Sequence, residues 1–338
     1  MLRAKPDISV IVCCHTQEFI YDFVESVKRS VGVSYEIIVV SSDDELSAQG
    51  IVGCTVFNGP AMPAAKRNRG ARIAKGKYLA FFDDDVEVAP DCLATLQNTL
   101  EMTKAGMVYG KLHKADEPHR FDEAGGFLTW TGFIWSRAGQ NIVDEGQYNE
   151  VEPIFSGKSA SCMIEERLFT KIGGFDEDFG ILGEESDLAW RVWLAGREVY
   201  WAPDAKAIHW FNCKRKDPKV YYTSTRVNRN GARNYCWMLI KNLEAHNLCR
   251  VLPIHVSIWL MAAVIMIGTG KFGQGVNVLK GLWQVVSGLP SILRKRRKVQ
   301  SQRVRTDAEL NKLIFRSPSR AYYTERFRRY IGNPSLHG

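Results

Sequence analysis

Short apolar runs alternate with stretches of helical periodicity through the first 210 residues of the chain. Nearly continuous apolar runs at 7–14, 35–42 and 77–85 predict strands. Between them, apolar residues at helical spacing predict helices over 19–30 and 64–76. Apolar strands separated by helices are typical of a parallel sheet that is covered on both faces. The pattern therefore predicts an α/β fold for this part of the chain.

The pattern changes twice beyond these elements. Between residues 106 and 162, Gly and Trp interrupt short strand-like pieces, and a later helix ends at Gly196, which we expect to be its C-cap. After His209 the sequence becomes basic and helical. We place the domain boundary there, so that residues 1–212 form the α/β domain and residues 213–338 form a basic, helical C-terminal region.

The C-terminal region contains two apolar segments of different kinds. Val251–Gly270 has no charged residue and is about as long as a membrane span. In 276–293 the apolar residues fall at helical spacing, which predicts an amphipathic helix, and the basic cluster RKRRK (294–298) follows it. Its expected apolar face consists of Val276, Leu279, Trp283, Val286, Leu289 and Leu293.

An amphipathic helix with a Trp and a neighbouring basic cluster is typical of an anchor that lies in the surface of an anionic membrane. The alternative is that both apolar segments pack on the first domain or form a dimer interface, so oligomer formation stays open.

The charge of the chain is divided unevenly between its two parts. The 338 residues are 45% hydrophobic and 24% charged, as in globular proteins, and their net charge is +8. Residues 1–200 hold 20 Lys+Arg and 31 Asp+Glu (−11), whereas residues 201–338 hold 25 and 6 (+19). A basic region binds nucleic acid or an anionic membrane, and the apolar run within this one favours the membrane. We expect no nucleic-acid partner.

The eight cysteines and the N-terminus both indicate a cytosolic setting. No two cysteines form a CxxC pair, and most lie in apolar segments, which argues against a disulfide framework or a zinc ribbon. Asp7 comes too early for the apolar core of a secretory signal, so we expect no export.

Carboxylates follow two of the predicted strands. Asp43 and Asp44 come after the second strand, and the run Asp83–Asp85 closes the strand at 77–85. The carboxyl ends of parallel strands are where such sheets bind ligands. Asp83 and Asp85 lie two residues apart, point the same way on an extended chain, and offer the oxygen ligands that Mg²⁺ and Mn²⁺ prefer. A bound ion would bridge to a substrate diphosphate, although an acidic turn is the alternative for this motif taken alone.

The order of motifs over residues 6–210 resembles that of family 2 glycosyltransferases. Four stretches carry the resemblance: PDISVIV, EIIVVSSDDE, AAKRNRGARIAKGKYLAFFDDDVEV and GGFDEDFGILGEESDLAWRVWLAGREVYWAPDAKAIH. The resemblance, which includes rhamnosyltransferase-like and membrane-associated members, implies the GT-A fold of nucleotide-diphospho-sugar transferases. In that fold a mixed, mainly parallel sheet has helices on both faces.

The resemblance assigns roles to individual residues at the donor side. Asp83 and Asp85, completed by His209, would bind Mn²⁺ or Mg²⁺ together with the diphosphate of the donor. We assign Asp84, between the two, to nucleotide-sugar binding. The remaining nucleotide contacts would be Asp43 or Asp44 at the base or ribose, and Arg67 with Asn68 beside the phosphates.

On the acceptor side, the resemblance implies that Glu185 is the general base of an inverting transfer and that Glu184 binds an acceptor hydroxyl. Glu185 stands where the family usually has Asp, which lengthens the base by one methylene. The sequence also departs from the family pattern after the first strand, where it has CCHT (13–16), and after the second, where it has SSDDE.

Together these features predict a metal-dependent, inverting glycosyltransferase that extends a lipid-linked or cell-surface glycan. Nucleotide sugars are cytosolic, so the catalytic domain must lie on the cytoplasmic side, and the basic tail favours the same side. One simple span between them would place them on opposite sides of the membrane. We therefore expect peripheral or monotopic attachment to the cytoplasmic face of the membrane. The alternatives are a nucleotidyltransferase on a related sheet, for which a Gly-rich basic loop after the first strand is lacking, and a non-catalytic membrane or nucleic-acid binding scaffold with a degenerate site.

Overall fold

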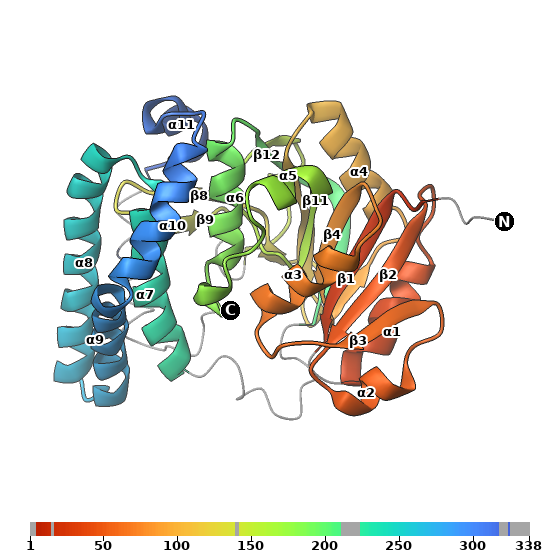
Figure 1. Ribbon diagram of the computed structural model, residues 1–338, viewed down its shortest axis with the longest axis horizontal. Helices are drawn as coiled ribbons and strands as arrows, with labels where there is room; N and C mark the ends of the chain where they lie inside the picture. The colour runs from red at the N-terminus through yellow and green to blue at the C-terminus, as the bar shows by residue number, and fades with distance from the viewer. Residues whose placement is uncertain (1–4, 15–16, 139–141, 211–223, 318–323, 325–338) are drawn as a thin grey trace. The chain divides into compact units, whose positions relative to one another are not determined.

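The chain divides into two compact units in the computed structural model, which describes residues 5–14, 17–138, 142–210, 224–317 and 324. The sheet unit comprises Met1–Gly126 and Ser136–Lys214. The helical unit comprises Phe127–Trp135 and Arg215–Gly338. The expected boundary at residue 212 falls within 211–223, outside the described residues. Figure 1 shows the elements of both units.

The sheet unit is built on one mixed sheet with the strand order β10-β12-β6-β11-β4-β1-β2-β3, in which β5 also pairs with β12 and β7 with β6. Its strands are β1 (Ile8–Cys14), β2 (Tyr35–Ser41), β3 (Cys54–Asn58), β4 (Tyr78–Asp83), β5 (Val86–Val88), β6 (Met107–Lys114), β7 (Phe121–Glu123), β10 (Glu152–Pro153), β11 (Ser161–Glu165) and β12 (Val199–His209). β1 is parallel to β2 and β4, β2 to β3, and β12 to β6. Antiparallel β11 separates the two parallel groups. The expected α/β fold with a mainly parallel sheet is confirmed.

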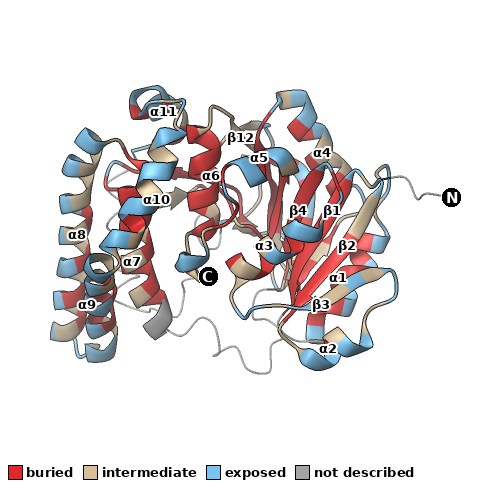
Figure 2. Ribbon diagram, in the orientation of Figure 1, coloured by how far each residue is buried: buried red, intermediate tan, exposed pale blue. Residues whose placement is uncertain are grey.

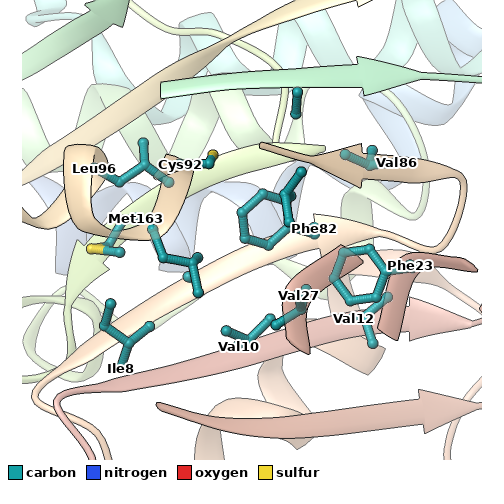
Figure 3. Close-up of a cluster of buried hydrophobic side chains, with 14 of the residues drawn as sticks. Ile8, Val10, Val12, Phe23, Val27, Phe82, Val86, Cys92, Leu96 and Met163 are labelled. Carbon is teal, nitrogen blue, oxygen red and sulfur yellow. The ribbon is translucent and has the colours of Figure 1, made fainter. Parts of the chain in front are cut away.

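Helices cover both faces of this sheet. They are α1 (Gln17–Lys28), α2 (Asp44–Gln49), α3 (Pro63–Ile73), α4 (Cys92–Thr103), α5 (Glu166–Lys171), the 3₁₀ turn η1 (Glu177–Phe179) and α6 (Glu184–Leu194). One face packs against α1 and α4 in a single apolar cluster, of which Figure 3 labels Ile8, Val10, Val12, Phe23, Val27, Phe82, Val86, Cys92, Leu96 and Met163. On the other face, Gly70 of α3 lies against Ile11, and Phe81 contacts Phe169 and Phe175. Because both faces are covered, β1 is buried along its whole length.

The helical unit contains α7 (Ser224–Asn242), α8 (Ala245–Gly268), α9 (Phe272–Ser287), α10 (Leu289–Ser301), α11 (Asp307–Ile314) and the short strands β8 (Gly126–Leu128) and β9 (Ile134–Ser136). Glycines allow close approach of its helices. A Cβ on Gly281 of α9 would lie 2.3 Å from the carbonyl oxygen of Arg229 on α7, and one on Gly275 would lie 2.8 Å from that of Ala263 on α8. The core of this unit therefore depends on small residues as well as apolar ones.

The amphipathic helix expected over 276–293 is two helices, because the chain breaks at Gly288 between α9 and α10. Pro290 stands in the first turn of α10, where the missing N–H of proline costs nothing, whereas within a continuous helix it would remove a hydrogen bond.

The β8–β9 hairpin is encoded between strands of the sheet unit but packs in the helical unit. Its Phe133 ring lies 5.4 Å from Tyr235, 4.1 Å from His255 and 5.8 Å from Trp259, centroid to centroid. Trp259 Nε1 donates to His255 Nε2 (2.9 Å), so His255 Nδ1 is the nitrogen that donates to the carbonyl oxygen of Thr131 (2.8 Å). The hairpin is thus held by both apolar contacts and a directional hydrogen bond.

Two further expectations concern cysteines and membrane spans. The seven cysteines in the described part of the chain form no disulfide, and Cys213 lies outside it. Among the described residues, α8 is the one helix long and apolar enough to cross a membrane, judged by length and composition. This helix contains all but the last two residues of the predicted apolar run Val251–Gly270.

Candidate functional site

The carboxylates that close β4 meet the end of β12 because of strand register. β4 ends at Asp83, and after a turn the chain enters β5, which runs antiparallel to β12 with Val86 opposite His209. This pairing brings Asp85 against His209, whose Nε2 lies 3.2 Å from Asp85 Oδ1. One ligand atom from each of Asp83, Asp85 and His209 lies within 4.8 Å of the others. The structure therefore brings together the three residues that sequence analysis assigned to a metal.

This group, hereafter the metal group, has a donor set that fits a divalent cation. Two carboxylates and one imidazole suit Mn²⁺, and the carboxylates suit Mg²⁺. Among the described residues it is the one cluster of three such side chains close enough to share an ion. Asp85 and His209 are both buried, and burial disfavours a charged imidazole. Asp85 and Asp122 outweigh that effect and raise the pKa of His209 to about 10.

Asp122, which sequence analysis did not identify, lies directly behind His209. Its Oδ2 is 2.8 Å from His209 Nδ1 and its Oδ1 is 2.9 Å from Lys158 Nζ. Burial opposes the ionised carboxylate, yet Lys158 and His209 hold the pKa of Asp122 below its ordinary value. The sequence offered no local signal for this residue, since Asp122 reaches His209 only because β7 and β12 both pair with β6.

Arg67 joins the metal group to α6. Its guanidinium is almost completely buried and donates to Asp83 Oδ1 (2.7 Å) and to Glu184 Oε1 (3.2 Å). The same guanidinium lies over the ring of Phe175, 5.3 Å from its centroid. Burial opposes its charge, but Asp83 and Glu184 raise the pKa of Arg67 well above its ordinary value. A permanent positive charge therefore lies between the end of β4 and the start of α6.

Glu184 and Glu185 form the first turn of α6, whose N-cap Gly183 has a φ of 85° that only glycine adopts readily. Glu184 is buried, and its Oε2 finds no hydrogen-bond partner among the described residues. Glu185 is half-buried. Burial and the neighbouring Glu184 raise the pKa of Glu185 well above its ordinary value. Perturbed pKa values of this kind are typical of carboxyl groups in catalytic sites.

Three of the predicted nucleotide contacts make hydrogen bonds within the fold and do not join this group. Asp43 caps α2 by accepting from the backbone N–H of Leu46 (3.1 Å), and Asp44 accepts from Asn58. Asn68 forms a reciprocal pair with the backbone of Phe175, at 2.9 Å in both directions. This pair fixes α3 to the turn before α6.

Asp84 and the CCHT segment were also expected at this edge of the sheet. Asp84, the middle carboxylate of the run, is buried. Lys66 lies near it and donates to the carbonyl oxygen of Cys14 and to Ser42 Oγ (3.1 Å). Of the CCHT segment, residues 15 and 16 lie outside the described residues.

Comparison with known proteins gives consistent matches. Residues 9–162 match the model of Glycosyl transferase family 2. A putative polypeptide N-acetylgalactosaminyltransferase 13 of Drosophila melanogaster is 30% identical over 152 residues, 43% of this chain and 27% of that protein. A glucosyl-dolichyl phosphate glucuronosyltransferase of Haloferax volcanii is 24% identical over 228 residues, 60% of this chain and 68% of that protein.

A crystal structure of GalNAc-T7 with UDP, GalNAc and Mn²⁺ superposes with a TM-score of 0.56 at 15% identity, over 86% of this chain and 58% of that one. At this identity the likeness concerns the fold, which is the GT-A fold. The chain spans about a quarter of the length of that Drosophila protein and of a second one, N-acetylgalactosaminyltransferase 6.

Proposed function

Residues 9–162 belong to glycosyl transferase family 2, and on this premise we propose that the chain transfers a sugar from a nucleotide-diphosphate sugar to a glycan or a lipid-linked glycan. One observation carries the proposal: buried Arg67 donates to both Asp83 and Glu184. The residues for the leaving group and those for the acceptor hydroxyl are thereby parts of one connected site.

On the donor side, Asp83, Asp85 and His209 would hold Mn²⁺ or Mg²⁺. The bound ion would stabilise the negative charge of the departing nucleoside diphosphate. Arg67 fixes the carboxylate of Asp83 and adds a positive charge beside it. We propose Asp43, Asp44, Asn68 and Asp84 as nucleotide-side residues, with Asn68 acting through the turn that it fixes. The solved GalNAc-T7 structure, which contains UDP and Mn²⁺, supports this choice of donor and ion.

On the acceptor side, Glu185 removes the proton as the acceptor hydroxyl attacks the anomeric carbon. A positioned base of this kind contributes roughly 10²–10⁴ in rate. Glu184 is oriented by Arg67 through Oε1, which leaves Oε2 to accept a hydrogen bond from an acceptor hydroxyl. Because attack occurs on the side opposite the leaving group, the transfer inverts the anomeric configuration. The name of the Haloferax relative includes a dolichyl phosphate, which supports a lipid-linked acceptor.

We also propose that the helical unit attaches the protein to the cytoplasmic face of a membrane. α9 turns its apolar side outward: Val276, Leu279, Trp283 and Val286 are 40%, 40%, 69% and 60% exposed. Its buried residues are the small or polar Gly275, Asn277 and Gly281 together with a single Val278. Figure 2 shows the exposed surface along α8 and α9. α8 adds exposed Ile254, Leu260, Met261 and Val264.

The charge of the helical unit supports an anionic surface as the partner. Between Glu244 and Asp307 the sequence has ten Lys or Arg residues and no Asp or Glu. A stretch that combines exposed apolar residues with charge of one sign is suited to lipid headgroups and acyl chains at once. Under this proposal residues 1–212 are the catalytic part, and 213–338, with the β8–β9 hairpin, are the membrane-attaching part.

A thermal-shift panel of UDP, dTDP, GDP and CMP sugars, with and without Mn²⁺, tests the donor assignment. The correct donor at about 100 times its Kd stabilises the folded state by about 2.7 kcal/mol. We expect that stabilisation to require Mn²⁺ or Mg²⁺ and to be lost in Asp85→Ala, since Asp85 is a member of the metal group. Unchanged metal-dependent binding in Asp85→Ala would contradict the assignment.

Product analysis separates the proposed reaction from its alternatives. A glycosyltransferase releases a nucleoside diphosphate from the donor, a nucleotidyltransferase releases pyrophosphate from a nucleoside triphosphate, and a non-catalytic scaffold releases neither.

A further inference from the structure

Asp122 connects a member of the metal group to the half-buried Lys158. Its two carboxylate oxygens are used separately: Oδ2 faces His209 Nδ1 at 2.8 Å, and Oδ1 faces Lys158 Nζ at 2.9 Å. The side chains of Asp122 and His209 are 8% and 4% exposed, so water does not compete for this hydrogen bond. The carboxylate is therefore fixed at both oxygens.

The other nitrogen of His209 faces the metal group. Nε2 lies 3.2 Å from Asp85 Oδ1, and Asp83 and Asp85 are both within the 4.8 Å cluster. An imidazole that binds an ion through one nitrogen donates its N–H from the other, and a carboxylate that accepts this N–H sets the tautomer and the ring orientation. Asp122 stands where such an acceptor is needed.

We propose that Asp122 is a positioning residue that orients His209 Nε2 toward the divalent ion, and that Lys158 holds Asp122 in place. This inference rests on the proposed metal role of Asp83, Asp85 and His209. It gives a role to Lys158, which precedes β11 in the sequence and would otherwise be an ordinary surface lysine. It also explains why the short strand β7 is placed beside the metal group.

A second His–Asp–Lys arrangement in the sheet unit provides a matched control. Asp144 Oδ2 lies 2.8 Å from His113 Nε2 and 2.9 Å from Lys111 Nζ. His113 belongs to none of the candidate metal clusters of the described residues. The same three side-chain types thus hold a loop to β6 outside the metal group, so Asp144→Asn reports the structural cost of losing such a carboxylate.

The test measures binding of Mn²⁺ alone to the full-length chain, by titration calorimetry and by the electron paramagnetic resonance signal of free Mn²⁺. Asp122→Asn replaces one acceptor with a donor, and we expect it to weaken Mn²⁺ binding about 10- to 100-fold. Asp144→Asn should leave the Mn²⁺ affinity within about twofold of the wild type. Lys158→Met, which removes one of the two contacts of Asp122, should weaken binding in the same direction but less.

A double-mutant cycle with His209→Ala shows whether Asp122 acts through the histidine. If it does, Asp122→Asn costs no further Mn²⁺ affinity once His209 is absent. Equal losses in both backgrounds, or a lower melting temperature with unchanged Mn²⁺ affinity, would overturn the inference. Asp85→Ala separates the two proposals: if it weakens Mn²⁺ binding and Asp122→Asn does not, only the positioning role fails. If neither variant changes Mn²⁺ binding, the metal group itself is wrong.

Discussion

β1 and α9 use apolar residues in opposite ways. In β1 all seven side chains of Ile8–Cys14 are buried, because helices cover both faces of the sheet. In α9 most of the large apolar residues face outward, whereas Val278, Gly275 and Gly281 are buried against the neighbouring helices. Large side chains at the two glycine positions would clash with backbone oxygens, so the helix packs through these glycines together with Val278. An apolar sequence therefore predicts burial only when a covering element is available, and for α9 we propose that the membrane supplies it.

Charged residues show a related contrast. In the sheet unit the buried cation Arg67 is paired with carboxylates. In the helical unit, Arg296 donates to the carbonyl oxygens of Ile240 and Leu243 at the end of α7, where helix carbonyls lack intrahelical partners. Arg294, Arg297 and Lys298 from the same basic cluster are exposed. Only part of the cluster is thus available to bind anionic lipid.

The largest effect is expected at the site of the sheet unit. Glu185→Gln keeps the size of the side chain but removes its ability to accept a proton, so transfer should fall at least about a hundredfold. Donor binding, measured by the thermal shift with Mn²⁺, should stay nearly unchanged. Transfer within a few fold of the wild type would exclude Glu185 as the base and point to Glu184.

A pair of aromatic substitutions tests the contrast between inward and outward residues of the helical unit. Phe133→Ala removes a partly buried ring that packs on the core around His255, so it should lower the unfolding free energy, by less than the about 3–5 kcal/mol typical of a fully buried Phe. Trp283→Ala removes an exposed ring of α9 and should change the melting temperature little while weakening binding to anionic vesicles. Denaturant unfolding and vesicle sedimentation measure the two effects.

If Trp283→Ala destabilised the protein as much as Phe133→Ala, α9 would pack against protein through its apolar face and the membrane proposal would fail.

The hairpin also affects how the helical unit is removed. A chain ending near residues 212–240 should lose vesicle binding, but it also exposes Phe133. It therefore gains solubility only if the hairpin is replaced by a short polar turn.

The smallest effect per residue is expected for the exposed cations. Each basic residue near an anionic surface is worth about 1 kcal/mol. Neutral substitutions of Arg294, Arg297 and Lys298 should therefore weaken binding to anionic vesicles by about 3 kcal/mol, leave binding to neutral vesicles nearly unchanged, and be reproduced by added salt. Arg296→Gln is the matched control. Because Arg296 donates to carbonyl oxygens at the end of α7, this variant should mainly lower the stability of the protein and should weaken salt-dependent vesicle binding less. Salt-independent vesicle binding by the wild type would contradict an electrostatic contribution.

Much of the sheet unit was predictable because its signals are local. The runs at 7–14, 35–42 and 77–85 appear as β1, β2 and β4 within two residues at each end. Asp83 and Asp85 were accessible for the same reason, since they are two residues apart, whereas His209 was assigned only through the resemblance to family 2 glycosyltransferases. The role of Asp43 as the cap of α2 was not foreseen, because the same position after a strand suits either a nucleotide contact or a helix start.

The sequence by itself determined which segments are strands, which helix is amphipathic, and where the carboxylates of the site stand along the chain. Periodicity and composition act over a few neighbouring residues, so one sequence suffices to detect them. Only the tertiary structure decided that Arg67 joins Asp83 to Glu184, that Asp122 lies behind His209, that the hairpin packs in the helical unit, and that α9 turns its apolar face outward. These facts depend on contacts between residues far apart in the chain, which strand register, helix packing and small residues such as Gly281 establish.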